Sequence, residues 1–164
     1  MKRILTIAMV FALAAGAAAT PAHAIGIFAS YWNLDKSNDD AWGVGLCQDK
    51  SVSPLISIHT SVTWVKFSDA EVDMFPLEVA AVGNLGLFYG GIGGGYYIFS
   101  GGEADLDNNW GWFAVAGAKI ALGGLGVFGE LRWNELSTNV ADTSFDVDLN
   151  GIGANVGVIL GGGK

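Results

Sequence analysis

The sequence predicts an all-β fold: an eight-stranded antiparallel up-and-down transmembrane β-barrel. Two observations predict it. After the N-terminal stretch, the chain divides into eight apolar segments separated by polar connections, and within several segments large apolar residues alternate with small or polar ones. A strand that crosses a bilayer needs about 9–11 tilted residues, with one face toward lipid and the other toward the lumen.

The N-terminus has the order of a secretory signal peptide. Met1, Lys2 and Arg3 form a positive start, an apolar run follows, and Ala22-His23-Ala24 is a small-residue cleavage site. A membrane anchor is the alternative, but the apolar run is short for a spanning helix. We therefore expect a cleavable signal peptide over residues 1–24 and one exported domain, the barrel, over residues 25–164.

Composition excludes several classes of protein. Without Lys2 and Arg3, six basic residues remain against sixteen acidic ones, which argues against a nucleic-acid partner. The single cysteine, Cys47, excludes an intrachain disulfide. Residues 79–99 carry no charge, but seven of these 21 are glycine, and each glycine costs a helix about 1 kcal/mol relative to alanine. Paired strands fit this stretch better than a spanning helix.

The apolar segments are short enough to be strands, and the connections between them alternate in length. Two connections, at residues 83–84 and 123–124, have only two residues, as expected of periplasmic turns. The expected strands are residues 25–34, 41–47, 55–67, 76–82, 85–99, 110–122, 125–136 and 151–160.

Alternation also indicates which face meets lipid. In residues 56–64, Ile56, Ile58 and Trp64 share one face, whereas Ser57 and His59 share the other. The second face of the segments holds glycine, serine and a few ionisable groups, which we expect to be too little to fill a dry core. No face has enough charge to meet water, so the apolar face is expected to contact lipid. A soluble exported ligand-binding barrel is the alternative.

The four longer connections are strongly acidic. With the N-terminus in the periplasm, the first, third, fifth and seventh connections all lie outside the cell. A calcium-like run, Asp105-Leu106-Asp107, lies in the fifth connection but lacks the EF-hand spacing, so divalent-cation binding by the loops is only a hypothesis. These connections hold twelve of the sixteen acidic residues: Asp35, Asp39, Asp40, Asp69, Glu71, Asp73, Glu103, Asp105, Asp107, Asp142, Asp146 and Asp148.

Aromatic residues collect near the strand ends on the side of these loops, where a girdle at the headgroup level is expected. The alternative is that they are core aromatics of a soluble sandwich. The residues are Tyr31, Trp32, Trp42, Trp64, Tyr96, Tyr97, Trp110, Trp112 and Trp133.

Five ionisable residues are expected inside the barrel: Glu78, Lys119, Glu130, Arg132 and His59. Charge that faces lipid at mid-bilayer costs about 2–4 kcal/mol for Arg or Lys, so these groups are expected to form a salt-bridge network that plugs the lumen. A charged constriction in a narrow pore is the alternative.

A hydrolytic site is a further alternative for the same interior. A His and a Ser two positions apart share a strand face, and with an acid they can form a triad. The candidate residues are His59, Ser61 and Glu78. The expectation is nevertheless that the protein is not an enzyme.

Several stretches resemble the outer-membrane β-barrel domain family, which includes OmpX- and OmpA-type eight-stranded barrels and short "porin family" proteins. They are Pro76-Leu77-Glu78, the run from Leu87 to Tyr97, the run from Gly111 to Gly117, and Phe128-Gly129-Glu130-Leu131-Arg132-Trp133. The resemblance implies the outer membrane of a Gram-negative-type cell and insertion by the barrel assembly machinery. Such barrels commonly end on an aromatic residue, whereas the last aromatic here is Phe145.

The expected function is a monomeric outer-membrane barrel with a structural, surface-interaction or minor-channel role. Its expected surroundings are outer-membrane lipid and lipopolysaccharide, and no cofactor or metal is expected. A lipid-modifying hydrolase resembling lipid A deacylases is the enzymatic alternative.

Overall fold

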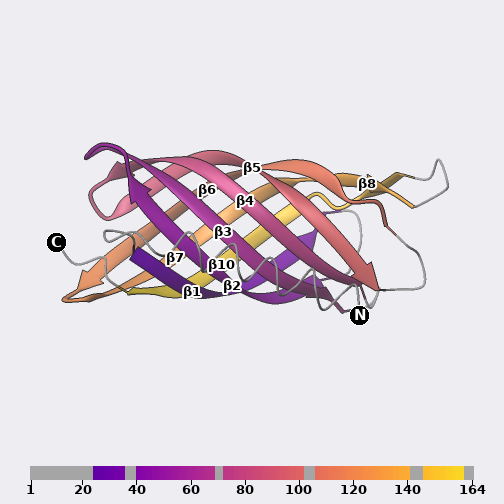
Figure 1. Ribbon diagram of the computed structural model, residues 1–164, viewed down its shortest axis with the longest axis horizontal. Helices are drawn as coiled ribbons and strands as arrows, with labels where there is room; N and C mark the ends of the chain where they lie inside the picture. Colours follow the sequence, from indigo (N-terminus) through magenta and orange to yellow (C-terminus); the bar gives the residue numbers. More distant parts are fainter. Residues whose placement is uncertain (1–23, 36–39, 69–71, 102–105, 141–145, 161–164) are drawn as a thin grey trace.

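The computed structural model describes residues 24–35, 40–68, 72–101, 106–140 and 146–160 (Figure 1). The predicted signal peptide lies outside them except for Ala24. Within the described ranges, no helix is both long and apolar enough to cross a membrane. The strands are β1 Ala24–Leu34, β2 Asp40–Ser51, β3 Ile56–Phe67, β4 Val72–Leu85, β5 Phe88–Gly101, β6 Asn109–Leu122, β7 Leu125–Glu135, β8 Ser137–Asn139, β9 Asp146–Asp148 and β10 Gly151–Leu160.

Eight strands form one closed antiparallel barrel in the order β1-β10-β7-β6-β5-β4-β3-β2. The ring closes because β1 pairs with β2 on one side and with β10 on the other, with Ile27 opposite both Leu46 and Val158. Figure 1 shows the strands tilted along the length of the barrel. The predicted all-β, eight-stranded antiparallel barrel is confirmed.

The barrel has two different ends. We call the end with the β2–β3, β4–β5 and β6–β7 connections the turn end, and the other the loop end. At the turn end, β6 and β7 join through Gly123-Gly124, as predicted, and Gly123 has a φ of 69°, which glycine adopts without strain. The β4–β5 turn lies at Gly86-Leu87, with a φ of 67° at Gly86, and not at residues 83–84.

Two strands extend beyond their predicted bounds, as their short predicted lengths require, one at the loop end and one at the turn end. The strand predicted over residues 76–82 begins at Val72, and the one predicted over residues 41–47 continues to Ser51. The seventh connection is not wholly irregular, because β8 and β9 pair within it as a small hairpin beyond the barrel (Figure 1). A bridge from Leu106 to Val140 joins this hairpin to the β5–β6 connection.

Alternation places the faces as predicted. On β3, Ser57 and Thr63 are buried inside, whereas Ile56 and Trp64 are exposed outside. On β10, Asn155 is buried and Val156 is 63% exposed. Every strand of the barrel therefore has one outward apolar face.

The interior is better packed than expected. Large apolar side chains fill the loop end of the barrel, so the prediction that the second face cannot fill a dry core is wrong. Part of this filling comes from Val72, Met74 and Leu149, which lie where the sequence pattern predicts connections rather than strands. The loop-end core consists of Trp32, Leu34, Ala41, Val65, Phe67, Val72, Met74, Tyr97, Phe99, Leu136 and Leu149.

Inward glycines make room for aromatic rings further along the lumen. A Cβ atom on Gly45 would lie 2.3 Å from the ring of Phe28, and one on Gly93 would lie 2.5 Å from the ring of Phe113. Both rings are buried. Small residues on one strand thus accommodate large ones on another, which is how a narrow barrel fills its interior.

Candidate functional site: the polar clusters of the barrel interior

The central bridge is an ion pair between Glu78 and Arg132. Arg132 Nη1 donates to Glu78 Oε2 at 2.9 Å, and Nη2 donates to Oε1 at 2.8 Å. Both side chains are buried, with exposed fractions of 10% for Arg132 and 3% for Glu78. Because β4 and β7 are separated by two strands in the barrel, this bidentate pair crosses the lumen.

Additional groups complete the central bridge. Ser61 Oγ donates to Glu78 Oε2 at 3.0 Å, and Tyr97 OH donates to Oε1 at 3.0 Å. The Arg132 guanidinium carbon lies 4.0 Å from the centre of the Phe113 ring. Each Glu78 oxygen therefore accepts two hydrogen bonds, and the guanidinium lies against an aromatic face, which favours a buried ion pair.

The second cluster, the Glu130 cluster, is formed by Glu130, Tyr89 and Asn155. Tyr89 OH donates to Glu130 Oε2 at 2.8 Å, and Asn155 Nδ2 donates to Oε1 at 2.8 Å. Tyr89 lies on β5 and Asn155 on β10, so the carboxylate of β7 links strands on both sides. Glu130 and Asn155 are buried.

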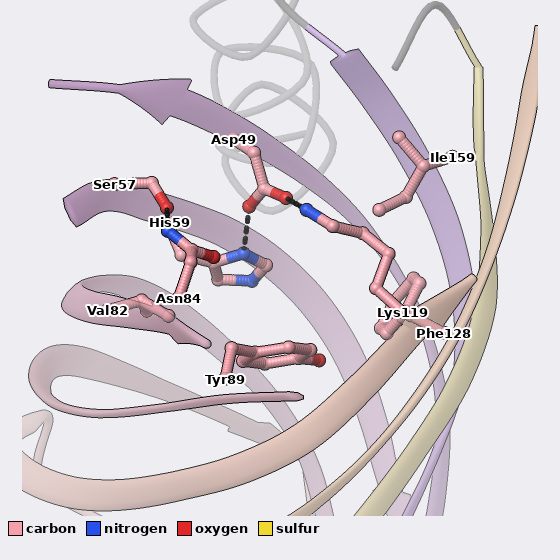
Figure 2. Close-up of a pocket in the computed structure, with 9 residues that line it drawn as sticks. All are labelled: Asp49, Ser57, His59, Val82, Asn84, Tyr89, Lys119, Phe128 and Ile159. Carbon is pink, nitrogen blue, oxygen red and sulfur yellow. Dashed lines mark hydrogen bonds and ion pairs between the residues drawn. The ribbon is translucent and has the colours of Figure 1, made fainter. Parts of the chain in front are cut away.

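The third cluster, the turn-end cluster, contains Asp49, His59 and Lys119 (Figure 2). His59 Nδ1 lies 2.6 Å from Asp49 Oδ1, and Lys119 Nζ donates to Asp49 Oδ2 at 2.9 Å. In the same pocket, Asn84 Nδ2 donates to Ser57 Oγ at 2.7 Å. The cluster lies at the turn end because Asp49, His59 and Lys119 lie near the strand ends there.

All five predicted lumen residues point into the barrel, but not as one network. The structure divides them between the three clusters, and Arg132 pairs with Glu78 across the lumen although Glu130 is its neighbour on the same strand face. Sequence reasoning missed Asp49, Tyr89 and Tyr97. The alternation on each strand was a usable signal, since Asp49 has the same parity as the inward Cys47.

The triad considered from the sequence does not form. His59 pairs with Asp49, whereas Ser61 donates to Glu78. Glu78 is in turn held by Arg132 and is therefore part of an ion pair. A hydrolytic serine must give its proton to a histidine, and the structure gives Ser61 a carboxylate partner instead.

Most of the aromatic residues predicted for the girdle face outward in the loop half of the barrel, with two exceptions. Trp42, Trp110 and Trp133 are exposed outward, and cross-strand ring pairs join Tyr31 with Trp42, Tyr96 with Trp110, and Trp112 with Trp133. Trp64 also faces outward, and its Nε1 donates to Asp73 Oδ1 at 3.1 Å. Trp32 and Tyr97 are not part of the girdle, since they are buried in the loop-end core.

Only part of the predicted acidic rim can be placed. Asp40 begins β2 at the loop end, and Asp35 directly follows β1 there. Asp107 lies in the β5–β6 connection, and Asp146 and Asp148 lie in β9 beyond the barrel. Among the described residues, no group of three or more His, Cys, Asp or Glu is placed to hold a metal ion. Outside the described residues lie Asp39, Asp69, Glu71, Glu103, Asp105 and Asp142.

Two small cavities adjoin the polar clusters. One cavity lies at the turn-end cluster and another beside the central bridge, and each has a volume of about 10 Å³. This volume is close to that needed for one water molecule.

Comparison with known proteins supports the fold. No protein-family model and no curated protein matches the chain. Neisserial surface protein A is similar in structure, with a TM-score of 0.63 and 11% sequence identity over 85% of this chain and 97% of that one. A de novo designed transmembrane β-barrel matches with a TM-score of 0.48 and 12% identity over 86% of this chain and 96% of that one. At 11% identity, what this chain shares with the surface protein is the small β-barrel fold.

Proposed function

We propose that this chain is a small outer-membrane β-barrel protein with a closed interior, whose role is structural or surface-interacting rather than that of a channel. In this proposal it is exported by its signal peptide and inserted by the barrel assembly machinery. It lies in lipid as a monomer and presents its acidic loops to lipopolysaccharide and the cell exterior.

The observation that carries the proposal is the apolar outer surface. Large hydrophobic side chains are exposed on all eight strands, including Ile92 at 68%, Leu131 at 64% and Val156 at 63%. A soluble protein rarely exposes a continuous apolar surface of this extent, because transfer of apolar area to water is unfavourable. Such an apolar outer surface is stable in contact with lipid, and the outward tryptophans fit the level where headgroups meet water.

The closed interior favours a scaffold over a channel. The loop-end core, the central bridge and the Glu130 cluster follow one another along the lumen, and the two cavities are of water size. An eight-stranded barrel has an interior just wide enough for side chains to fill. With a filled lumen, the loops are the part of the protein available for recognition.

Cell fractionation with gel electrophoresis tests the membrane location. The protein is expected in the outer-membrane fraction, and its apparent size is expected to change on boiling because the folded barrel resists detergent. Recovery in the soluble periplasmic fraction would overturn the proposal.

Planar-bilayer recording tests the closed interior. The purified, refolded barrel is expected to add no conductance above that of the lipid, with an open porin as the positive control. Stable single-channel steps from the refolded protein would show that the channel alternative is right.

A further inference from the structure

The cavity beside the central bridge has a polar lining from several strands. Its lining includes Ser30 and Trp32 of β1, Thr63 of β3, Arg132 of β7, and Asn155 of β10. It lies between the loop-end core and the Glu130 cluster, since Trp32 belongs to the former and Asn155 to the latter. Its volume is about 10 Å³.

Three of the lining side chains carry a buried polar atom with no hydrogen-bond partner among the described residues. These atoms are Arg132 Nε, Asn155 Oδ1 and Trp32 Nε1. Trp32 is 5% exposed, Asn155 is 2% exposed, and the Arg132 side chain is 10% exposed. Buried polar groups are almost always paired, with protein or with ordered water, because leaving one unpaired costs about 1–3 kcal/mol.

The strand register explains the space next to these atoms. Gly153 lies directly between Trp32 of β1 and Arg132 of β7 across the neighbouring strands, and it has no side chain to fill the gap. Asn155 is the next inward residue along β10. Its orientation is set, because its Nδ2 donates to Glu130, so Oδ1 is the acceptor that remains.

We propose that this cavity is a binding site for one structural water molecule, which accepts a hydrogen bond from Arg132 Nε–H and donates one to Asn155 Oδ1. The Trp32 indole N–H lies outside this bridge, because its Nε1 is beside Gly151, two residues along β10 from Gly153. The unpaired Arg132 Nε–H is a donor and the unpaired Asn155 Oδ1 is an acceptor, which matches water, a molecule that both accepts and donates. A halide ion would accept from Arg132 Nε–H but would also lie against the Asn155 oxygen, which is itself an acceptor.

The water connects two clusters that are otherwise separate. Arg132 belongs to the central bridge, and Asn155 belongs to the Glu130 cluster. Through the bound water, the hydrogen-bond network extends from Glu78 to Tyr89 across the middle of the lumen. The water site therefore links the two clusters and fills the polar space between the loop-end core and the Glu130 cluster.

A crystal structure of the refolded barrel, at a resolution that shows ordered water, tests the site directly. We expect one water peak within hydrogen-bond distance of Arg132 Nε and Asn155 Oδ1. A cavity without density would overturn the proposal. Crystals grown with sodium bromide in place of sodium chloride provide the second arm, because an anomalous bromide peak at the site would show an anion and also overturn it.

The variant Gly153→Ala tests the same site by displacement. A Cβ atom at Gly153 would lie 3.2 Å from the Tyr31 carbonyl oxygen and 3.3 Å from Asn134 Nδ2, so a methyl group enters the region with small shifts. If water is bound, the methyl group displaces it and leaves the polar atoms unpaired, so the urea midpoint of unfolding falls. The matched control is Gly129→Ala on β7, where the nearest atom to an added Cβ is 4.0 Å away. An equal or higher midpoint for Gly153→Ala than for Gly129→Ala would contradict the proposal.

Discussion

Removing the negative charge of the central bridge is expected to destabilise the barrel strongly. The change is Glu78→Gln, which keeps the size of the side chain. Its amide NH2 group would face the Arg132 donors, and one buried guanidinium would lose its counter-charge. The effect is on the folded state, because Glu78 and Arg132 meet only when strands β4 and β7 face each other across the lumen.

The expected magnitude follows from the burial of the pair. Loss of one partner of a buried ion pair costs about 3–5 kcal/mol, because the remaining charge is uncompensated. The pair here fits that class, since Glu78 is 3% exposed and accepts four hydrogen bonds, two of them from Arg132. Replacing both charges in Glu78→Gln/Arg132→Met is expected to recover most of the loss, because no unpaired charge remains.

The assay is urea unfolding of the refolded protein in lipid bilayers, followed by tryptophan fluorescence, for the wild type, both single variants and the double variant. The four free energies of unfolding form a double-mutant cycle that isolates the interaction. Asp146→Asn, which removes an exposed carboxylate beyond the barrel, is the control and is expected to change stability by less than about 0.5 kcal/mol. A Glu78→Gln variant as stable as this control would refute the role of the bridge.

Three further changes separate the packing, lipid and turn-end contributions. Gly93→Ala is expected to cost about 1–3 kcal/mol in urea unfolding, because its Cβ would lie 2.5 Å from a backbone oxygen and would overpack the lumen. The control Gly90→Ala, with 3.5 Å to its nearest atom, should be neutral. Equal stability of the two variants would contradict this packing. Ala116→Lys on the outward face is expected to lower the free energy of unfolding in bilayers by about 2–4 kcal/mol. The control Asn33→Lys, at the loop-end rim, is expected to lower it by about 0–1 kcal/mol. Equal losses for the two variants would argue against lipid at the outward face. Lys119→Met is expected to lower the free energy of unfolding by only about 1 kcal/mol, because Lys119 is 38% exposed. A loss as large as that for Glu78→Gln would contradict this small contribution of the turn-end cluster to stability.

Much of the barrel follows from local pattern. Alternation fixed which face of β3 and β10 points outward, and β10 has the predicted bounds of residues 151–160. The inward position of the charged residues follows from the same parity, since it needs no knowledge of neighbouring strands.

The local sequence pattern does not indicate which side chains pair with one another across the lumen. The Glu78–Arg132 pair joins strands that are not neighbours, so it depends on the stagger of the whole barrel. Part of the loop-end core was missed for a related reason, because Val72, Met74 and Leu149 lie in stretches predicted as connections, where no buried face was expected. Trp32 shows that aromatic character near a strand end does not by itself place a side chain in the girdle, since its parity with Phe28 turns it inward.

If lipid surrounds the barrel while side chains close its interior, tryptophans on the outside and the inside differ in their access to lipid. Two single-tryptophan variants are needed, one that retains only Trp133 and one that retains only Trp32, with the other tryptophans replaced by phenylalanine. Trp133 is 46% exposed on the outside, and Trp32 is 5% exposed within. In bilayers of brominated phospholipid, we expect strong quenching of Trp133 fluorescence and little quenching of Trp32. Equal quenching of both, or no quenching of Trp133, would contradict this arrangement.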